Sequence, residues 1–409
     1  MDIRPILSSL VRHKTAALLI VLEIALTCAI VCNALFLIQR RLDTLNEPSG
    51  IAEDTLLEIQ LGGIGTQTNA EARTAEDLAA LRAVPGVVAA TVTNQVPFYD
   101  SSSNTGLGLD PNQARDTINV AQYEGADLVS TLGLHLVSGR DFLPDEIALS
   151  SEINARLAAD PSKVSASVLI TSSVARKLFP DGKPLGKVVY TGSIPLTVVG
   201  VVDTLARPSL WGSDSSPGDS MILPIHQPYT DGAYFVRVAS PDRRAQVLKD
   251  AVAALMKVDR NRLVLRQRTY EESRADYFSN DRSMVWLMAV VIAALLVVTA
   301  LGIVGLASFW VQQRTKQIGV RRALGATRGQ VLRYFQTENF LLATVGIGIG
   351  MLGAYGLNQL LMSHYELPRL PWTYLPVGAA ALWLLGQVAV FGPARRAAAV
   401  PPAVATRSV

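Results

Sequence analysis

The segment MVWLMAVVIAALLVVTALGIVGLASFWV, residues 284–311, contains no charged side chain. A helix rises about 1.5 Å per residue, so about 20 apolar residues cross the hydrocarbon core of a membrane, which is about 30 Å thick. Three more apolar stretches reach this length, at residues 15–38, 340–361 and 372–391. Buried helices of soluble proteins rarely stay apolar for so long, and the pattern therefore predicts four transmembrane helices. The first stretch lacks the small residues of a signal-peptidase site, so we expect an uncleaved anchor.

The overall composition averages two unlike parts of the chain. Hydrophobic residues make up 49% of the sequence, charged residues 17%, and there are 2 cysteines, which excludes disordered chains and disulfide-built domains. Residues 39–282 carry 24 Lys and Arg against 30 Asp and Glu, a net charge of −6. The remaining residues carry 13 against 4, a net charge of +9. A water-facing domain is therefore joined to a cationic membrane part.

The cationic residues outside that domain predict the orientation of the helices. Twelve of the 13 lie in three short segments, namely residues 1–14, 312–339 and 392–409. The short segment 362–371 holds only Arg369 against Glu366. Because Lys and Arg concentrate in cytoplasmic loops, we predict that the three cationic segments are cytoplasmic. Segment 362–371 and the large domain, residues 39–283, are then outside.

The large domain alternates between strand-like and helical patterns, which predicts a mixed α/β fold. Two strand–helix–strand units are predicted, at residues 56–61, 74–84 and 87–93, and at residues 234–239, 241–257 and 262–268. Between them, residues 168–202 hold further strands and one helix, and residues 100–116 and 208–219 have loop compositions. We therefore predict one α/β part from about residues 50–135 and 225–270, interrupted by an inserted mixed subdomain at about 136–224.

The cytoplasmic segment QRTKQIGVRRALGATRGQVLRYFQTE, residues 313–338, has a distinctive pattern. Residues 317–324 can form two helical turns with Ile318 and Ala323 apolar and both arginines exposed, and Gly325 is a natural stop. Thr327 and Gln330 form a capping box for a second helix. The pattern predicts a short helix and a tight turn that form a rigid connection between two membrane helices. We call this connection the knuckle. The alternative is that the arginines only set topology or touch anionic lipid.

This knuckle, above all residues 318–328, resembles the signature of MacB/FtsX-like permeases of ABC transporters, the four-span mechanotransmission class. The tail at 393–398 and the outer segments at 138–142, 174–187 and 198–202 are also similar to that family. The resemblance implies a porter-like α/β part and a coupling helix that docks on an ATPase. The coupling role would fall on Gln317, Ile318, Gly319, Val320, Arg321, Arg322, Ala323, Leu324, Gly325, Ala326 and Thr327. The family usually has Glu at position 317, so Gln317 removes a charge-assisted contact.

The resemblance also implies the partners and location of the chain. These 409 residues contain no P-loop, G-x-x-x-x-G-K-[ST], so we expect ATP and Mg²⁺ on a separate ABC ATPase subunit and neither a catalytic residue nor a cofactor here. The expected setting is a bacterial inner membrane, with a second permease copy or paralogue, membrane lipids, and no nucleic acid. A periplasmic adaptor and an outer-membrane channel stay open as partners. Export or extraction of an amphipathic substrate is the expected work. The alternatives are an FtsX-like regulator of a cell-wall hydrolase or peptide sensor, and an anchor without an ATPase.

Several residues inside the predicted helices are further candidates. Glu23 and Asn33 lie within the first span, where an ionisable group suggests either function or a protonated acid bonded to a neighbouring helix. Gly346, Gly350 and Gly353 include a Gly-x-x-x-Gly pair that suits either dimerisation or packing within the chain. The cysteine pair, Cys28 and Cys32, and the four scattered histidines lack the spacing of metal ligands, so no metal site is predicted.

Overall fold

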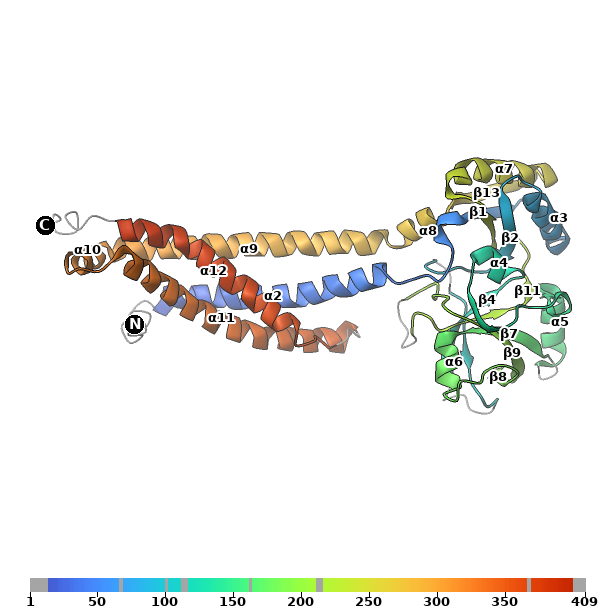
Figure 1. Ribbon diagram of the computed structural model, residues 1–409, viewed down its shortest axis with the longest axis horizontal. Helices are drawn as coiled ribbons and strands as arrows, with labels where there is room; N and C mark the ends of the chain where they lie inside the picture. The colour runs from blue at the N-terminus through green and yellow to red at the C-terminus, as the bar shows by residue number, and fades with distance from the viewer. Residues whose placement is uncertain are drawn as a thin grey trace. The chain divides into compact units, whose positions relative to one another are not determined.

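A computed structural model describes residues 14–65, 69–99, 102–111, 117–161, 164–210, 216–365 and 369–399. The chain divides into two compact units (Figure 1). A helical unit comprises Met1–Leu45 with Asp281–Val409, and an α/β unit comprises Asn46–Asn280. The two units correspond to the two compositions of the sequence.

The described residues of the helical unit contain four helices that are long and apolar enough to cross a membrane, which confirms the predicted fold class. These helices are α2 (Lys14–Leu45), α9 (Ser279–Gln313), α11 (Arg328–Tyr365) and α12 (Tyr374–Ala399), and the short α10 (Thr315–Ala323) lies between α9 and α11. Most of them extend past the apolar stretches in the sequence, because a helix continues through polar residues until a cap or breaker ends it. The clearest case is α11, which begins at Arg328 directly after a capped turn.

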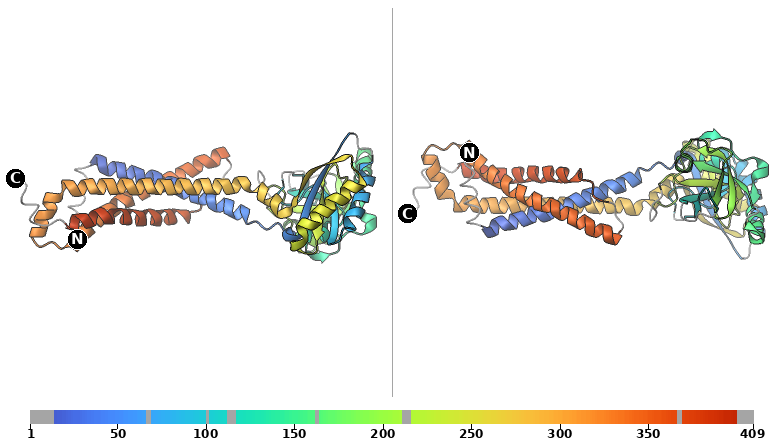
Figure 2. Two further views of the ribbon diagram at one scale, coloured as in Figure 1. Left: turned by 90° about the horizontal axis from the view of Figure 1, so that it is seen from above. Right: turned by 90° about the horizontal axis from the view of Figure 1, so that it is seen from below.

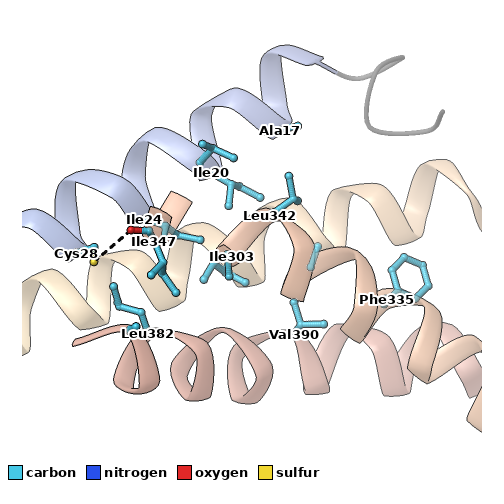
Figure 3. Packing of buried hydrophobic residues seen from close by; sticks show 14 of the residues in the cluster. Ala17, Ile20, Ile24, Cys28, Ile303, Phe335, Leu342, Ile347, Leu382 and Val390 are labelled. Carbon is cyan, nitrogen blue, oxygen red and sulfur yellow. Dashed lines mark hydrogen bonds between the residues drawn. The ribbon is translucent and has the colours of Figure 1, made fainter. Parts of the chain in front are cut away.

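The interior of the helical unit is built around α2. Helices α11 and α12 both pack on α2, and α2 and α11 cross one another in the two views of Figure 2. Their shared apolar core is drawn in Figure 3 and includes Ile20, Ile24, Leu342, Ile347 and Leu382. By contrast, α9 leaves many of its large apolar side chains exposed, among them Trp286, Val298 and Leu301. Lipid-facing helices expose such side chains because hydrocarbon covers them.

The first part of the α/β unit is a four-stranded antiparallel sheet with strand order β13-β1-β12-β2. The strands are β1 (Leu56–Gly63), β2 (Val87–Thr93), β12 (Ala233–Val238) and β13 (Arg262–Thr269). Helices α3 (Ala70–Arg82) and α7 (Arg244–Val258) pack against each other and cover the sheet with Leu78, Leu81, Val247, Ala251 and Leu255. The connectivity is the split βαβ arrangement, β-α-β-β-α-β. The predicted strand–helix–strand units are both present.

The second part is a seven-stranded sheet inserted between β2 and β12. Its order is β3-β4-β10-β7-β9-β5, and β8 pairs with β9. The strands are β3 (Asn104–Leu107), β4 (Ile118–Glu124), β5 (Leu136–Gly139), β7 (Ala166–Thr171), β8 (Val188–Thr191), β9 (Ile194–Val202) and β10 (Ser220–Leu223). The short strands β6 (Ala148–Leu149) and β11 (Ile225–His226) form a separate pair. Helices α4 (Leu128–Leu132), α5 (Ser150–Ala159), α6 (Ser172–Leu178) and α8 (Tyr270–Tyr277) complete the unit.

The insertion begins earlier than the sequence pattern predicts. Strands β3 and β4 belong to the second sheet, so the inserted part starts near Asn104 rather than near residue 136. Strand β3 also lies within residues 100–116, which the composition assigns to a loop. Its sequence, Asn-Thr-Gly-Leu, has little strand propensity. Backbone pairing with β4 therefore makes it a strand, and pairing is a tertiary property.

The two parts of the α/β unit share a third core. Leu56 of β1 and Phe235 of β12 are buried together with Tyr123 of β4 and Leu169 of β7. The first part also contains a buried ion pair, in which Arg262 donates to Asp77 at 3.0 Å and to the carbonyl of Leu255 at 2.7 Å. Because the third core contains residues of both sheets, the two parts of the α/β unit form one body rather than two independent domains.

Candidate functional site

The knuckle comprises residues 314–327 between α9 and α11, namely Arg314, helix α10 and the turn that follows it. Helix α10 ends in a backbone motif that stops a helix. Gly325 has φ +97°, in the left-handed region that favours glycine. The N–H of Gly325 donates to the carbonyl of Arg322 at 3.1 Å, and that of Ala326 donates to Arg321 at 3.0 Å. These two bonds form a Schellman motif, which satisfies carbonyls at the end of α10.

The next helix starts two residues later with reciprocal capping. The hydroxyl of Thr327 accepts from the N–H of Gln330 at 3.3 Å, and the Gln330 carboxamide accepts from the N–H of Thr327 at 2.9 Å. This is the predicted capping box. Only Leu324 to Thr327 separate α10 from α11, so the turn has little freedom to change direction.

Helix α10 has one face toward the bundle and one toward solvent. Ile318 and Gly319 are buried, and Ile318 belongs to the core of the helical unit. Gln317, Val320, Arg321 and Leu324 are exposed at positions i, i+3, i+4 and i+7, which lie along one helix face. The exposed fractions of Val320 and Leu324 are 50% and 83%. We call Gln317, Val320, Arg321 and Leu324 the α10 face.

The other residues assigned to the knuckle divide between these environments. Ala323, Gly325 and Thr327 are exposed, and Ala326 is half-buried. The expectation that both arginines are exposed is wrong for Arg322, which is half-buried and donates to the carbonyl of Ala398 on α12 at 3.1 Å. A carbonyl near a helix C-terminus attracts a cation, so Arg322 links α10 to α12.

Arg314 and Glu338 form a link that the sequence pattern did not assign. Arg314 lies between α9 and α10, and its guanidinium donates to the two carboxylate oxygens of Glu338 on α11 at 2.9 and 3.1 Å. Their side chains are 11% and 1% exposed. Glu338 is the sole acidic residue between positions 283 and 365, and a lone acid in a cationic stretch was the available signal. The pair ties the knuckle to α11.

The intramembrane polar candidates join α2 to its neighbours. Asn33 donates from Nδ2 to the carbonyl of Ala354 on α11 at 3.0 Å. The hydroxyls of Thr27 and Thr299 lie 2.8 Å apart and connect α2 with α9. One turn away, Glu23 faces Gly302 of α9 so closely that a Cβ atom there would lie 2.5 Å from the Glu23 carboxylate. A glycine at this position therefore leaves the space that the acid occupies.

The glycine pair of α11 packs within the chain. A Cβ atom at Gly346 would lie 2.9 Å from Cβ of Ile24, and one at Gly350 would lie 2.5 Å from Cβ of Cys28. Gly353 is looser, since its Cβ would meet Ala29 at 3.6 Å. Of the two uses left open for this motif, packing of α11 on α2 is the one seen in the structure.

Metal-ion chemistry has no visible basis in the described ranges. They contain no group of three or more His, Cys, Asp or Glu side chains that could hold an ion. Cys28 and Cys32 are buried free cysteines, and the Cys28 thiol points toward the carbonyl of Ile347 at 3.9 Å (Figure 3).

Comparison with protein families decides which permease class this architecture represents. The model for the FtsX-like permease C-terminal region matches residues 289–402, and the model for the MacB-like periplasmic core domain matches residues 17–254. The chain belongs to the MacB/FtsX-like permease family. Within that family, the knuckle lies inside the FtsX-like region, and the two sheets lie largely inside the MacB-like region.

Several curated relatives of this MacB/FtsX-like permease bear the name macrolide export ATP-binding/permease protein MacB. That of Chromobacterium violaceum is 28% identical over 68% of this chain and 42% of its own length. That of Acinetobacter baylyi is 26% identical over 88% of this chain and 52% of its own, and one from Paracoccus denitrificans is 27% identical over 98% and 57%. The chain thus spans about half the length of the curated relatives it matches.

Two solved structures are similar to part of the permease. The periplasmic region of MacB from Actinobacillus actinomycetemcomitans is 19% identical, with a TM-score of 0.33, over 56% of this chain and 95% of that one. The extracellular domain of the ABC-type transporter YknZ from Gram-positive bacteria is 17% identical, with a TM-score of 0.33, over 52% of this chain and 100% of that one.

Proposed function

We propose that this chain is the permease subunit of an ABC transporter and that the α10 face is the docking surface for its ATPase. The observation that carries the proposal is the combination of exposed Val320 and Leu324 with exposed Arg321 on a short, firmly held helix. An exposed apolar pair next to a cation is typical of a protein interface, whose core is apolar and whose anchors often include Arg.

The links around α10 provide a route for motion from the ATPase into the membrane. Arg314–Glu338 joins the knuckle to α11, Arg322 joins it to α12, and the backbone joins it to α9. Displacement of α10 would therefore move three helices together instead of bending one loop. With 35 residues, α9 is about 50 Å long, which exceeds the membrane core and lets it carry motion beyond the bilayer.

In this proposal a partner ATPase binds ATP and Mg²⁺ and docks at the knuckle on the cytoplasmic side of the membrane. The N-terminal end of α2 and the C-terminal end of α12 also face the cytoplasm. A second permease copy or paralogue completes the transporter. The α/β unit then moves outside the membrane to expel or extract an amphipathic substrate. Its two-part architecture supports export over the regulatory alternative, because a regulator needs only a smaller outer domain to signal.

Leu324→Asp should separate the permease from its ATPase. The substitution removes an apolar contact from the docking surface and places a carboxylate in the interface, and the cost should be at least several-fold in complex stability. The tagged full chain is purified from membranes of its own host, and the co-purified fraction is assayed for a Walker-motif protein and for vanadate-sensitive ATP hydrolysis. Both should be present with the unmodified chain and strongly reduced with Leu324→Asp.

Arg333→Glu provides the control, because Arg333 is an exposed cation on α11 that does not belong to the α10 face. It should retain the ATPase, although it changes more charge than Leu324→Asp. Equal retention of the ATPase by the Leu324→Asp and unmodified chains would refute docking at the α10 face. If the ATPase were lost from both the Leu324→Asp and the Arg333→Glu chains, the contact would be purely electrostatic, and this result would also contradict the proposal.

A further inference from the structure

An open cavity of about 650 Å³ lies in the second part of the α/β unit, between α5 and the seven-stranded sheet. Its apolar lining includes Ile153 and Leu157 from α5, Leu196 from β9, and Leu223 and Ile225 from the end of β10 and from β11. The volume falls within the range of small-molecule sites, about 300–1,000 Å³. Such sites combine an apolar lining with a few polar groups, and this cavity has both.

Helix α5 is only partly covered by the rest of the protein. None of its ten residues is buried. Ile153 and Leu157 are four residues apart, so they share one helix face, and both line the cavity. A short amphipathic helix gains most of its stability by burying its apolar face. An apolar body in the cavity would bury the face of α5 that the chain leaves half-exposed.

The charged groups around the cavity are mostly acidic. Asp145, Glu146 and Glu152 lie at its border, with Arg156 as the cation among the lining residues. Glu146 is already engaged, because Arg140 donates to both of its carboxylate oxygens at 2.7 Å. Glu152 and Arg156 form a loose exposed pair at 3.8 Å. Among the described residues at this border, the acidic side chains therefore outnumber the one lining cation, Arg156.

Glu124, at the end of β4, also lines the cavity and differs from these residues. It is half-buried, and its carboxylate oxygens accept from the side-chain amides of Gln122 and Gln227. No cationic partner of Glu124 is present in the described part of the chain. Burial raises the pKa of Glu124 above its ordinary value. A half-buried carboxylate held only by neutral amides is the group that a cationic ligand would stabilise most.

We propose that this cavity binds a small organic cation with an apolar body, with its ammonium group at Glu124 and its apolar part against Ile153 and Leu157. The acidic border disfavours anions, and the described residues lack the three ligands that a metal ion would require. The proposal concerns a ligand site in the α/β unit and does not depend on ATPase docking at α10.

The test compares three probes that share one fluorophore and differ in charge. Dansylcadaverine carries a primary ammonium on a five-carbon chain, its N-acetyl derivative is neutral, and the dansyl derivative of aminohexanoic acid is anionic. Binding to the full chain in nanodiscs is measured by emission, with empty nanodiscs subtracted and without nucleotide or ATPase. The ammonium probe should bind at least tenfold more tightly than the neutral and anionic probes.

Two variants test whether the probe binds inside the cavity. Glu124→Gln keeps the size of the side chain and removes its charge, so it should weaken the ammonium probe about tenfold and leave the neutral probe unchanged. Leu157→Trp fills the apolar side of the cavity and should weaken the ammonium and neutral probes alike. Asp242→Asn is the matched control, since Asp242 is an exposed acid outside the cavity.

Three outcomes would overturn the proposal. They are equal affinity for the ammonium and neutral probes, equal effects of Glu124→Gln and Asp242→Asn, and full binding to Leu157→Trp. The Leu324→Asp chain should bind the probe normally. If that chain loses its ATPase and the cavity variants fail to respond, the cation site alone is refuted. If the cavity variants respond and the ATPase remains on Leu324→Asp, the docking proposal alone is refuted.

Discussion

Several charged residues in this protein form ion pairs that hold separate segments of the chain together. Arg314 and Glu338 hold the knuckle to α11, and Arg262 with Asp77 joins β13 to α3 inside the α/β unit. Each pair is largely removed from water, so the loss of one member would leave an uncompensated charge. Glu146 forms a more accessible pair, since its partner Arg140 is exposed; it also accepts hydrogen bonds from the N–H of Leu143 at 2.7 Å and from Ser167 at 2.6 Å.

Glu146 should make the stability of the α/β unit depend on acid pH. Its bonds to Arg140 and other donors lower its pKa from 4.5 to about 2. Because the folded-state pKa is lowered, the stabilisation is fully present above about pH 4.5 and is lost as pH falls toward about 2. The difference in unfolding midpoint between the full chain and Glu146→Gln, both in detergent, should be large at pH 6 and should shrink through that interval. A difference that stays constant from pH 6 to pH 2.5 would contradict this assignment.

At the scale of elements, the central contact of the helical unit is α2 against α11. Gly346 and Gly350 let the two helices approach, and Asn33 adds a hydrogen bond across the same interface. Without a strong hydrophobic force between helices in lipid, close packing and such polar contacts determine association. The α10 knuckle depends on this bundle, since Ile318 is buried in the same core.

Gly350→Ala should therefore weaken the helical unit. The added methyl group would lie 2.5 Å from Cβ of Cys28 and 2.7 Å from the carbonyl oxygen of Ala25, so the helices must separate. We expect a loss of about 1–3 kcal/mol, which reversible unfolding of the full chain in mixed micelles can measure. Gly348→Ala is the matched control, because its added methyl group meets nothing within 4 Å. Equal stability of the two variants would argue against the packing role of Gly350.

For the molecule as a whole, the chain connects the α/β unit directly to two helices of the membrane unit. Helix α2 ends at Leu45, directly before the α/β unit begins at Asn46, and α9 begins at Ser279, at the end of the α/β unit. In the proposed mechanism these connections carry motion from the knuckle to the outer domain. Stiffness at the junctions is then required, because a flexible linker would absorb the displacement.

Insertion of Gly-Gly-Ser between Leu45 and Asn46 should uncouple the two units without removing the ATPase. The altered chain should co-purify with the ATPase as the unmodified chain does, yet lose the substrate resistance or export that the transporter provides in cells. The same insertion between Asp181 and Gly182, an exposed turn, should preserve both properties. Normal export with the Leu45–Asn46 insertion would show that α2 does not transmit the motion.

Local sequence patterns determined the membrane helices and the knuckle, because each depends on neighbouring residues. Uninterrupted apolar length predicts α9, and the stop at Gly325 with the Thr327–Gln330 box predicts the break between α10 and α11. The first α/β part was also predictable, since its strands and helices have clear periodicity. Strand β3 was not, because its polar, glycine-containing sequence becomes a strand only when β4 lies beside it.

Four apolar stretches, an acidic α/β domain and a cationic knuckle can be recognised from the order of the residues without any structure. Tertiary structure alone decided which side of the knuckle is available. It buries Ile318, engages Arg322 with α12, and leaves Val320 and Leu324 exposed. It also brings together Arg314 and Glu338, which are 24 positions apart, and forms the open cavity that Glu124 lines together with residues of separate strands and of α5. The reason is physical: helix and cap formation depend on nearby residues, whereas burial and ion pairing depend on which distant segments pack together.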